Sequence, residues 1–204
     1  MQFRFVVPAG ALRLARLLVA PLLCVAAAAP AASFAQPAPG CPPLLANVAP
    51  RLQDEAPQNL CQYAGRVLLV VNTASFCGYT PQYEGLEALH ARYAQRGLVV
   101  LGFPSNDFNQ EPADNKSIAD FCFNTYGVKF PMFAKTSVVG QTAHPFFAAL
   151  ARASGQAPKW NFHKYLVDRD GKVVASFPSA VAPLDRRLTE RIEQLLARGQ
   201  AANR

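Results

Sequence analysis

The fold is decided by residues 67–103, which read VLLVVNTASFCGYTPQYEGLEALHARYAQRGLVVLGF. The stretch opens with a continuous apolar run at Val67–Val71, which is typical of a strand buried on both faces of a sheet. Thr80-Pro81 then predicts an N-cap followed by proline at the first helical position, and apolar residues keep helical spacing as far as Gly97. Leu98–Phe103 is a second buried strand. A strand, a crossover helix and a second strand make a βαβ unit, so the two strands are predicted to be parallel.

Downstream of this unit, the pattern predicts two further helices, a hairpin and a closing amphipathic helix. These elements are expected at residues 115–126 and 143–153 (helices), 165–168 with 172–177 (hairpin) and 184–196 (closing helix). Asp170-Gly171 between two apolar runs is a strong hairpin signal. Parallel strands followed by an antiparallel hairpin make a mixed central sheet flanked by helices. This α/β arrangement fits a thioredoxin-like fold.

The first 35 residues have the features of a secretory signal. They hold three arginines and no acidic residue, and Leu17–Ala29 is an apolar run of 13 residues, shorter than the roughly 20 that span a bilayer. Ser33 and Ala35 supply small residues before a cut at Gln36. We therefore expect a signal peptide over 1–35, a leader segment over 36–59 and a thioredoxin-like folded domain over 60–204. We also expect export, to a bacterial periplasm, and no stable membrane association after signal removal; an uncleaved N-terminal membrane anchor is the alternative.

The charge balance argues against a nucleic-acid partner. The whole chain has 20 basic and 13 acidic residues and a formal charge of +7. Loss of residues 1–35 removes three of the basic residues and none of the acidic ones, which leaves +4. This charge is mild, and no Lys/Arg-rich run or known nucleic-acid module accompanies it.

Five cysteines are present, and Cys24 lies in the expected signal, which leaves four. An exported compartment permits disulfides, and four cysteines allow three pairings between which the sequence does not choose. Cys41 and Cys61 bracket a short segment, and we expect a structural disulfide that pins it. Closing a loop of about 20 residues contributes roughly 3 kcal/mol in the chain-entropy account. Two free thiols are the alternative.

Four residues far apart in the sequence are predicted to converge at one edge of the sheet. Cys77 follows the first strand and Gln110 follows the second. Because the carboxyl ends of parallel strands lie at the same edge of a sheet, the loops that hold these two residues are expected at one edge. Trp160 and Asn161 lie just before the strand that starts near His163, and they reach this edge if that strand is antiparallel. The spacing alone also allows a purely structural interpretation. In it, Cys77 is a small buried residue, Trp160 belongs to the core, and Gln110 and Asn161 are polar loop residues.

Chemistry explains why such a set would be useful. A thiolate attacks a peroxide and a thiol hardly does, yet an ordinary cysteine with a pKa of about 8.5 is only a few per cent thiolate near pH 7. Lowering the pKa by two units needs roughly 2.7 kcal/mol, more than the roughly 0.3–1 kcal/mol that a helix N-terminus supplies. Hydrogen bonds to a charged group contribute about 1.5–3 kcal/mol each. Gln110, Trp160 and Asn161 are neutral donors of this kind, and they would also stabilise the departing oxygen.

Three motifs resemble the signatures of the glutathione peroxidase family. They are NTASFCGYT at 72–80, GFPSNDFNQEP at 102–112 and KWNF at 159–162, and YGVKFPMF at 126–133 also matches. The resemblance, from about Leu60 to Leu196, implies a thioredoxin-like fold and reduction of hydrogen peroxide and organic hydroperoxides. It implies no bound cofactor or metal, but an external thiol reductant, either a thioredoxin-like protein or glutathione. In the family the position of Cys77 holds the peroxidatic residue, and the other active-site members fall on Gln110, Trp160 and Asn161.

The resemblance also implies a recycling route. Cys122 stands where many cysteine-type relatives carry a resolving cysteine, which would condense with oxidised Cys77 to a disulfide; a buried helix cysteine is the alternative. Only Asn109 separates Phe108 from Gln110, where the family often has one more residue, so the exact placing of Gln110 stays open. The stretch before Pro158 lacks a long insertion that builds oligomers in some relatives, and a monomer is therefore expected.

Three other functions share the predicted fold. A disulfide oxidoreductase would want a Cys-x-x-Cys motif, but the residues after Cys77 include no second thiol before Thr80. A copper-binding thioredoxin-fold protein would want paired cysteines with a histidine near one edge, and the chain has three histidines. A sensor that relays peroxide oxidation to a partner would use the same Cys77 chemistry, and the sequence leaves it open.

Overall fold

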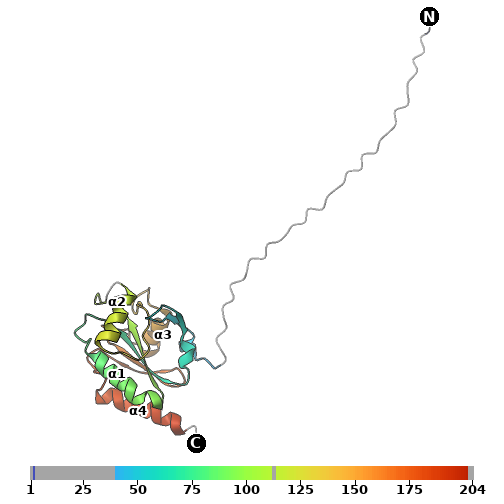
Figure 1. Ribbon diagram of the computed structural model, residues 1–204. Helices are drawn as coiled ribbons and strands as arrows, with labels where there is room; N and C mark the ends of the chain where they lie inside the picture. The colour runs from blue at the N-terminus through green and yellow to red at the C-terminus, as the bar shows by residue number, and fades with distance from the viewer. Residues whose placement is uncertain (1, 3–39, 112–113, 202–204) are drawn as a thin grey trace. The chain divides into compact units, whose positions relative to one another are not determined.

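The computed structural model of the 204-residue chain describes residue 2, residues 40–111 and residues 114–201 (Figure 1). The signal peptide expected over 1–35, and the leader as far as residue 39, lie outside the described residues. Within the described residues, no helix is long and apolar enough to cross a bilayer.

A four-stranded sheet forms the centre of the fold, in the order β4-β3-β5-β6. Its strands are β3 (Val67–Thr73), β4 (Leu98–Pro104), β5 (Lys164–Val167) and β6 (Val173–Phe177). β3 and β4 run parallel, whereas β5 is antiparallel to β3 and β6 is antiparallel to β5. The predicted mixed sheet of a thioredoxin-like α/β fold is confirmed.

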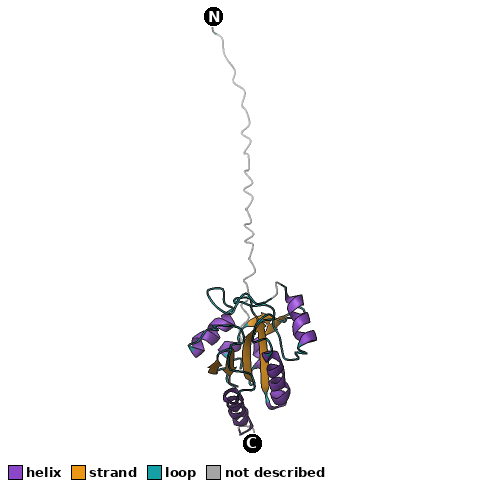
Figure 2. Cartoon of the chain, turned by 90° about the vertical axis from the view of Figure 1, so that its left-hand side faces the viewer, coloured by secondary structure: helices purple, strands orange, loops and turns teal. Residues whose placement is uncertain are grey.

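Helices cover both faces of this sheet (Figure 2). Successive residues of β3 point to opposite faces. Leu69 and Val71 therefore join one apolar cluster with α1 (Gln82–Tyr93) and α4 (Arg186–Ala201), and Leu68 and Val70 join the other with α3 (Pro145–Ser154). α1 and α4 lie side by side on their face in Figure 1. All seven residues of β3 are buried, as the unbroken apolar run predicts.

The start of α1 differs from the prediction in a way that bears on Cys77. The helix begins at Gln82 after Pro81, and Thr80 does not cap it through its side chain. Thr80 Oγ1 instead accepts a hydrogen bond from the Cys77 backbone N–H at 3.0 Å. The Thr80 N–H also donates to the Cys77 carbonyl at 3.0 Å, so residues 77–80 form a hydrogen-bonded turn.

The helix expected over 115–126 is also different. α2 (Asn115–Asp120) is followed by a turn of π-helix, η4 (Phe121–Thr125), before Gly127 with φ at +59°. The Asp114 carboxylate caps α2 by accepting from the Ser117 N–H at 2.8 Å. A π-helical turn adds a residue to the helical ladder and is frequent at functional sites, and it cannot be recognised from the apolar spacing.

Residues 43–59, expected as part of a leader, fold onto the domain. They form η1 (Pro43–Leu45) and the hairpin of β1 (Val48–Pro50) and β2 (Pro57–Asn59), followed by η2 (Leu60–Tyr63). Leu45 and Ala49 are buried at 1% and 0% exposure in the core cluster on the α3 side. Strands of three residues rich in proline give no periodic signal, which is why the sequence pattern does not predict them.

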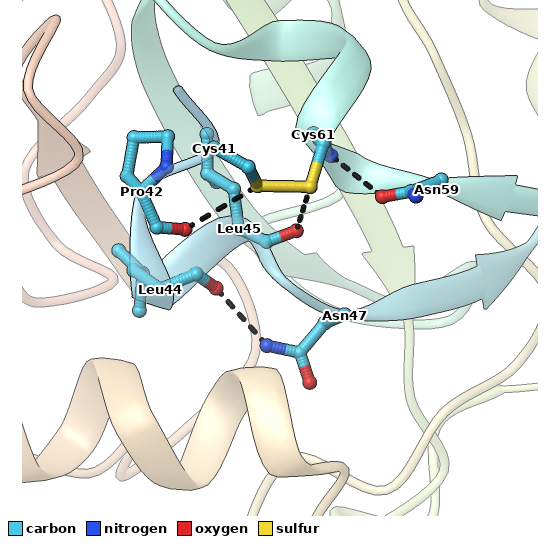
Figure 3. Close-up of a disulfide and its surroundings, with 7 residues drawn as sticks. All are labelled: Cys41, Pro42, Leu44, Leu45, Asn47, Asn59 and Cys61. Atoms are coloured by element: carbon cyan, nitrogen blue, oxygen red, sulfur yellow. Dashed lines mark hydrogen bonds between the residues drawn. A yellow bond between two sulfur atoms is a disulfide. The ribbon is translucent and has the colours of Figure 1, made fainter. Parts of the chain in front are cut away.

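A disulfide between Cys41 and Cys61 closes this segment, with 5.4 Å between the two Cα atoms (Figure 3). This is the pairing expected from the bracketing positions of the two residues. Asn59 Oδ1 accepts from the Cys61 N–H at 2.9 Å, and Asn47 Nδ2 donates to the Leu44 carbonyl at 3.0 Å (Figure 3). The bridge therefore joins Cys41, which precedes η1, to Cys61 in η2, a few residues before β3.

Candidate active site

Cys77 lies in the turn between β3 and α1, and the residue is 7% exposed. Thr80 Oγ1, which accepts from the Cys77 N–H, donates in turn to the Ala74 carbonyl at 3.0 Å and so fixes the turn. The Tyr79 backbone N–H donates to Cys77 Sγ at 3.4 Å. A backbone donor has no residue-type signature in the sequence. The one feature that could have suggested it is the position of Cys77 shortly before the start of a helix, where backbone N–H groups are available.

Gln110 lies in the loop after β4, and this loop is hydrogen-bonded to the Cys77 turn. The Phe76 N–H donates to the Gln110 carbonyl at 3.0 Å. Asn109 has φ at +57°, in the left-handed region, which asparagine tolerates better than most residues. The sharp bend at Asn109 explains how this short loop brings Gln110 to the edge of the sheet that holds Cys77.

Trp160 and Asn161 are held at the same edge by Asn72, near the end of β3. Asn72 Nδ2 donates to the Trp160 carbonyl at 3.2 Å, and Asn72 Oδ1 accepts from the His163 N–H at 3.1 Å. Asn161 is fully buried, and its Nδ2 donates to Gln110 Oε1 at 3.0 Å. The antiparallel pairing of β5 with β3 thus brings the third segment to the other two.

Exposed aromatic rings leave apolar surface around this edge. Phe76, the neighbour of Cys77, is 68% exposed, and its ring lies 6.2 Å from that of Phe121 between centroids. Trp160 is 40% exposed and lies 5.3 Å from the ring of Phe108. Two partly or largely exposed aromatic rings thus lie at this edge of the sheet.

The structure therefore brings Gln110 and Asn161 into direct contact and places the Gln110 loop against the Cys77 turn. Among the described residues, the hydrogen bond to the Cys77 sulfur comes from Tyr79 and not from the three predicted side chains. Trp160 reaches the site through its backbone contact with β3 and keeps an exposed ring.

Cys122 lies in η4 and is fully buried. Its Sγ donates to the hydroxyl of Tyr83 on α1 at 3.4 Å. Burial raises the pKa of the Cys122 thiol to about 12. Cys122 in this position is a protonated thiol at neutral pH, so it does not react as a thiolate without a change in its surroundings.

Two buried titratable residues that the sequence patterns do not assign lie beside Cys122. Tyr83 is fully buried, and burial raises its pKa well above the ordinary value. Glu111 is 7% exposed, and burial raises the pKa of its carboxyl to about 7. Its charge raises the pKa values of both Tyr83 and Cys122. The signal for Glu111 was its place directly after Gln110 in the second motif.

The histidines have local roles. His144 accepts from the Phe146 N–H through Nδ1 at the start of α3, and His163 Nε2 is 2.7 Å from Ser176 Oγ. In the part of the chain that the structure describes, no group of three or more histidine, cysteine, aspartate or glutamate side chains has a geometry that would hold a metal ion.

A cysteine in the turn after the first parallel strand of a thioredoxin-like sheet, with no Cys-x-x-Cys partner and with the Gln110 loop hydrogen-bonded to its turn, fits the class of thiol peroxidases. The comparisons give the family. The family model "Glutathione peroxidase" matches residues 45–151. This chain belongs to the glutathione peroxidase family, and it is a thiol peroxidase that reduces hydroperoxides.

Bacterial relatives align with about two thirds or more of this chain and with most of their own length. The chain is 47% identical over 151 residues to glutathione peroxidase homolog BsaA of Halalkalibacterium halodurans, an alignment that covers 72% of this chain and 95% of that one. It is 41% identical over 162 residues to thioredoxin/glutathione peroxidase BtuE of Escherichia coli, covering 67% and 88%. Among solved structures, it is similar to Trgpx in apo form, with 32% identity, a TM-score of 0.62 and coverage of 76% and 95%.

Proposed function

We propose that this peroxidase works by a two-cysteine cycle, in which Cys77 attacks the hydroperoxide and Cys122 resolves the oxidised product. The observation that supports it most is the convergence of the Cys77 turn with the hydrogen-bonded pair of Gln110 and Asn161. Cys77 and Cys122 are also the two free cysteines among the described residues.

The first step oxidises Cys77. Its thiolate attacks one peroxide oxygen, so that an S–O bond forms and the O–O bond breaks. Cys77 becomes a sulfenic acid, and the departing hydroxide or alkoxide takes up a proton and leaves as water or an alcohol. The amides of Gln110 and Asn161 and the indole of Trp160 are the neutral donors proposed to stabilise the charge on the departing oxygen.

The second step forms a disulfide. Cys122 Sγ attacks the sulfenic sulfur, so that the S–S bond forms and the S–O bond breaks. The hydroxide leaves as water with the proton of the Cys122 thiol. Because Cys122 is fully buried, η4 must open locally before the two sulfur atoms meet. The π-helical geometry of η4 supports such an opening, since it interrupts the regular hydrogen bonding of α2.

The third step restores both thiols. We propose a thioredoxin-like dithiol protein as the reductant, which transfers two electrons by thiol–disulfide exchange; the name of the E. coli relative, which includes both thioredoxin and glutathione, supports this choice without excluding glutathione. The exposed rings of Phe76 and Trp160 support organic hydroperoxides as substrates beside hydrogen peroxide. A monomer suffices for this cycle, because both cysteines belong to one chain.

We further propose that the protein is exported to a bacterial periplasm after removal of residues 1–35. The apolar, acid-free N-terminal sequence supports export, and so does the Cys41–Cys61 disulfide, since such bonds persist in oxidising compartments. Expression of the full chain and N-terminal sequencing of the periplasmic fraction test this proposal. A mature protein that starts at Gln36 is expected, and a chain that keeps its N-terminus in the membrane fraction would contradict it.

The cycle itself is tested with the wild-type protein and Cys122→Ser. Each reduced protein receives one equivalent of hydrogen peroxide, and intact mass and peptide mapping follow the products. We expect a Cys77–Cys122 bridge in the wild type and a sulfenic acid on Cys77 in the variant. With thioredoxin and its reductase, the wild type turns over continuously and the variant stops after one turnover.

Two controls make the test specific. Cys77→Ser should abolish the first turnover, and the Cys41–Cys61 peptides should be unchanged by peroxide. Steady turnover of Cys122→Ser at the wild-type rate would show that Cys122 is not the resolving residue. A Cys77 that peroxide does not oxidise would refute the cycle at its first step.

A further inference from the structure

Glu111 is a buried acid that the two-cysteine cycle does not use. It follows Gln110 in the loop after β4 and is 7% exposed. Its carboxylate accepts a hydrogen bond from the backbone N–H of Ser75, two residues before Cys77. The backbone N–H of Glu111 itself donates to Asn106 Oδ1 at 3.1 Å, so the residue is held at both ends.

The contact with Ser75 is one of two adjacent links between the loops. The Phe76 N–H donates to the Gln110 carbonyl at 3.0 Å, and the Ser75 N–H donates to the Glu111 side chain. Two consecutive residues that directly precede Cys77 in the sequence thus bind two consecutive residues of the loop after β4. A hydrogen bond to a carboxylate is roughly twice as strong as one between neutral groups. Glu111 is therefore the stronger of the two links between the cysteine turn and the glutamine loop.

This link is maintained at a cost to the fold. Glu111 Oε1 is buried without a hydrogen-bond partner among the described residues, and burial raises the carboxyl pKa to about 7. The neighbouring charges and titratable groups are Lys135, which lowers this pKa, and Tyr83 and Cys122, whose pKa values Glu111 raises. A buried acid with this unfavourable environment is more typical of a functional site than of a structural one.

We propose that Glu111 is a positioning residue of the peroxidase, whose ionised carboxylate fixes the Ser75–Phe76 backbone to the Gln110 loop and so sets the Cys77 sulfur relative to the Gln110–Asn161 amide pair. The role rests on the proposed attack by Cys77, and it is independent of Cys122 and of the reductant. Protonation of Glu111 weakens its acceptor oxygen for the Ser75 N–H. The reactivity of a given amount of Cys77 thiolate therefore falls as the pH drops through the titration of Glu111.

The test uses the full-length chain with Cys122→Ser as the parent, so that oxidation stops at the Cys77 sulfenic acid. The rate constant for hydrogen peroxide is measured from pH 5.5 to 9 (roughly 1.5–2 units on each side of neutrality) by trapping the sulfenic acid. The thiolate fraction is measured separately by ultraviolet absorbance, and the rate is divided by it. This division removes the titration of Cys77 from the profile.

In the parent, the rate per thiolate should rise through a pH near 7 and then level off. Glu111→Gln keeps the shape and an acceptor oxygen but removes the charge, so its profile should be flat and about tenfold below the parent plateau. The matched control is Glu87→Gln, because the Glu87 carboxylate also accepts a backbone N–H, from Lys129 at 2.8 Å, but lies on α1. Its profile should follow the parent.

A Glu111→Gln protein with the parent's rate and profile would overturn the proposal. So would a loss of rate that accompanies a lower melting temperature at pH 8, because a residue that only holds the fold together would behave in that way. If Glu111→Gln does not fold, Glu111→Asp keeps the charge but withdraws the carboxylate from Ser75, and it should be as slow on the plateau. A parent in which peroxide does not oxidise Cys77 would refute the proposed function, and this role with it; normal oxidation in every variant refutes this role alone.

Discussion

Replacement of both Cys41 and Cys61 by alanine removes the disulfide that ties residues 41–61 to the domain. The bridge joins residues 20 positions apart and encloses η1, β1 and β2 (Figure 3). Leu45, Ala49 and Leu60 remain available to pack in the core cluster on the α3 side. The change therefore tests the covalent constraint separately from the apolar burial of the segment.

The magnitude follows from the length of the closed loop. A cross-link over about 20 residues removes conformational entropy from the unfolded chain worth about 3 kcal/mol at 25 °C. For a domain of this size, each kcal/mol shifts the melting temperature by roughly 2–4 °C. We therefore expect the double variant to melt roughly 6–12 °C below the wild type.

Thermal and urea unfolding of the wild type, of the double variant and of Asn59→Ala measure this difference. Asn59→Ala is the control for local structure, since it removes the bond from Cys61 N–H to Asn59 Oδ1, which is worth about 1 kcal/mol, and keeps the disulfide. Oxidation of Cys77 by peroxide should be unchanged in the double variant, because the site is held by the loops after β3 and β4 and before β5.

A double variant whose free energy of unfolding lies less than about 1 kcal/mol below that of the wild type would contradict the loop-entropy account of the disulfide. It would mean that packing of the segment holds it in place and that the unfolded chain gains little freedom when the bridge is lost. A large loss of Cys77 reactivity in a folded double variant would also contradict the separation between the disulfide and the site.

Two further predictions concern the buried groups beside the active site. Folding raises the Glu111 pKa from 4.5 to about 7, so the folded protein binds the proton more tightly, and its stability falls as the pH rises through this window and stays lower above it. Glu111→Gln should therefore match the wild type near pH 4 and be about 3 kcal/mol more stable at pH 8, as measured by urea unfolding at a series of pH values; a variant less stable than the wild type at pH 8 would contradict this. Tyr83→Phe removes the hydroxyl that accepts a hydrogen bond from the Cys122 thiol, a bond worth about 1 kcal/mol. Opening of η4 should then be easier, and the Cys77–Cys122 disulfide should form about fivefold faster when samples are quenched at intervals and measured by mass spectrometry. An unchanged or slower rate would show that this bond does not hold η4 closed.

The fold was predictable to a large extent, because its decisive signals are local. The apolar run of β3, the helical spacing up to Gly97 and the second run of β4 specify a parallel βαβ unit, and Asp170-Gly171 specifies the hairpin. The hairpin of β1 and β2 was not predictable from the pattern, because its strands have three residues each and are stabilised by burial of Leu45 and Ala49 against distant residues. The π-helical turn at Cys122 likewise leaves the apolar spacing unchanged.

The motifs around Cys77, Gln110 and Trp160-Asn161 are long and specific to the glutathione peroxidase family, so the sequence alone was enough to assign the class of protein and to predict Cys77 as the reactive cysteine. How these segments meet depends on the folded structure, in which Asn161 donates to Gln110, a backbone N–H donates to Cys77, and the Glu111 carboxylate joins the two loops. The physical reason is that backbone donors and buried charges acquire their energies from neighbours brought together by folding. A sequence shows which groups are present, whereas their hydrogen-bond partners and their desolvation depend on residues that are distant along the chain.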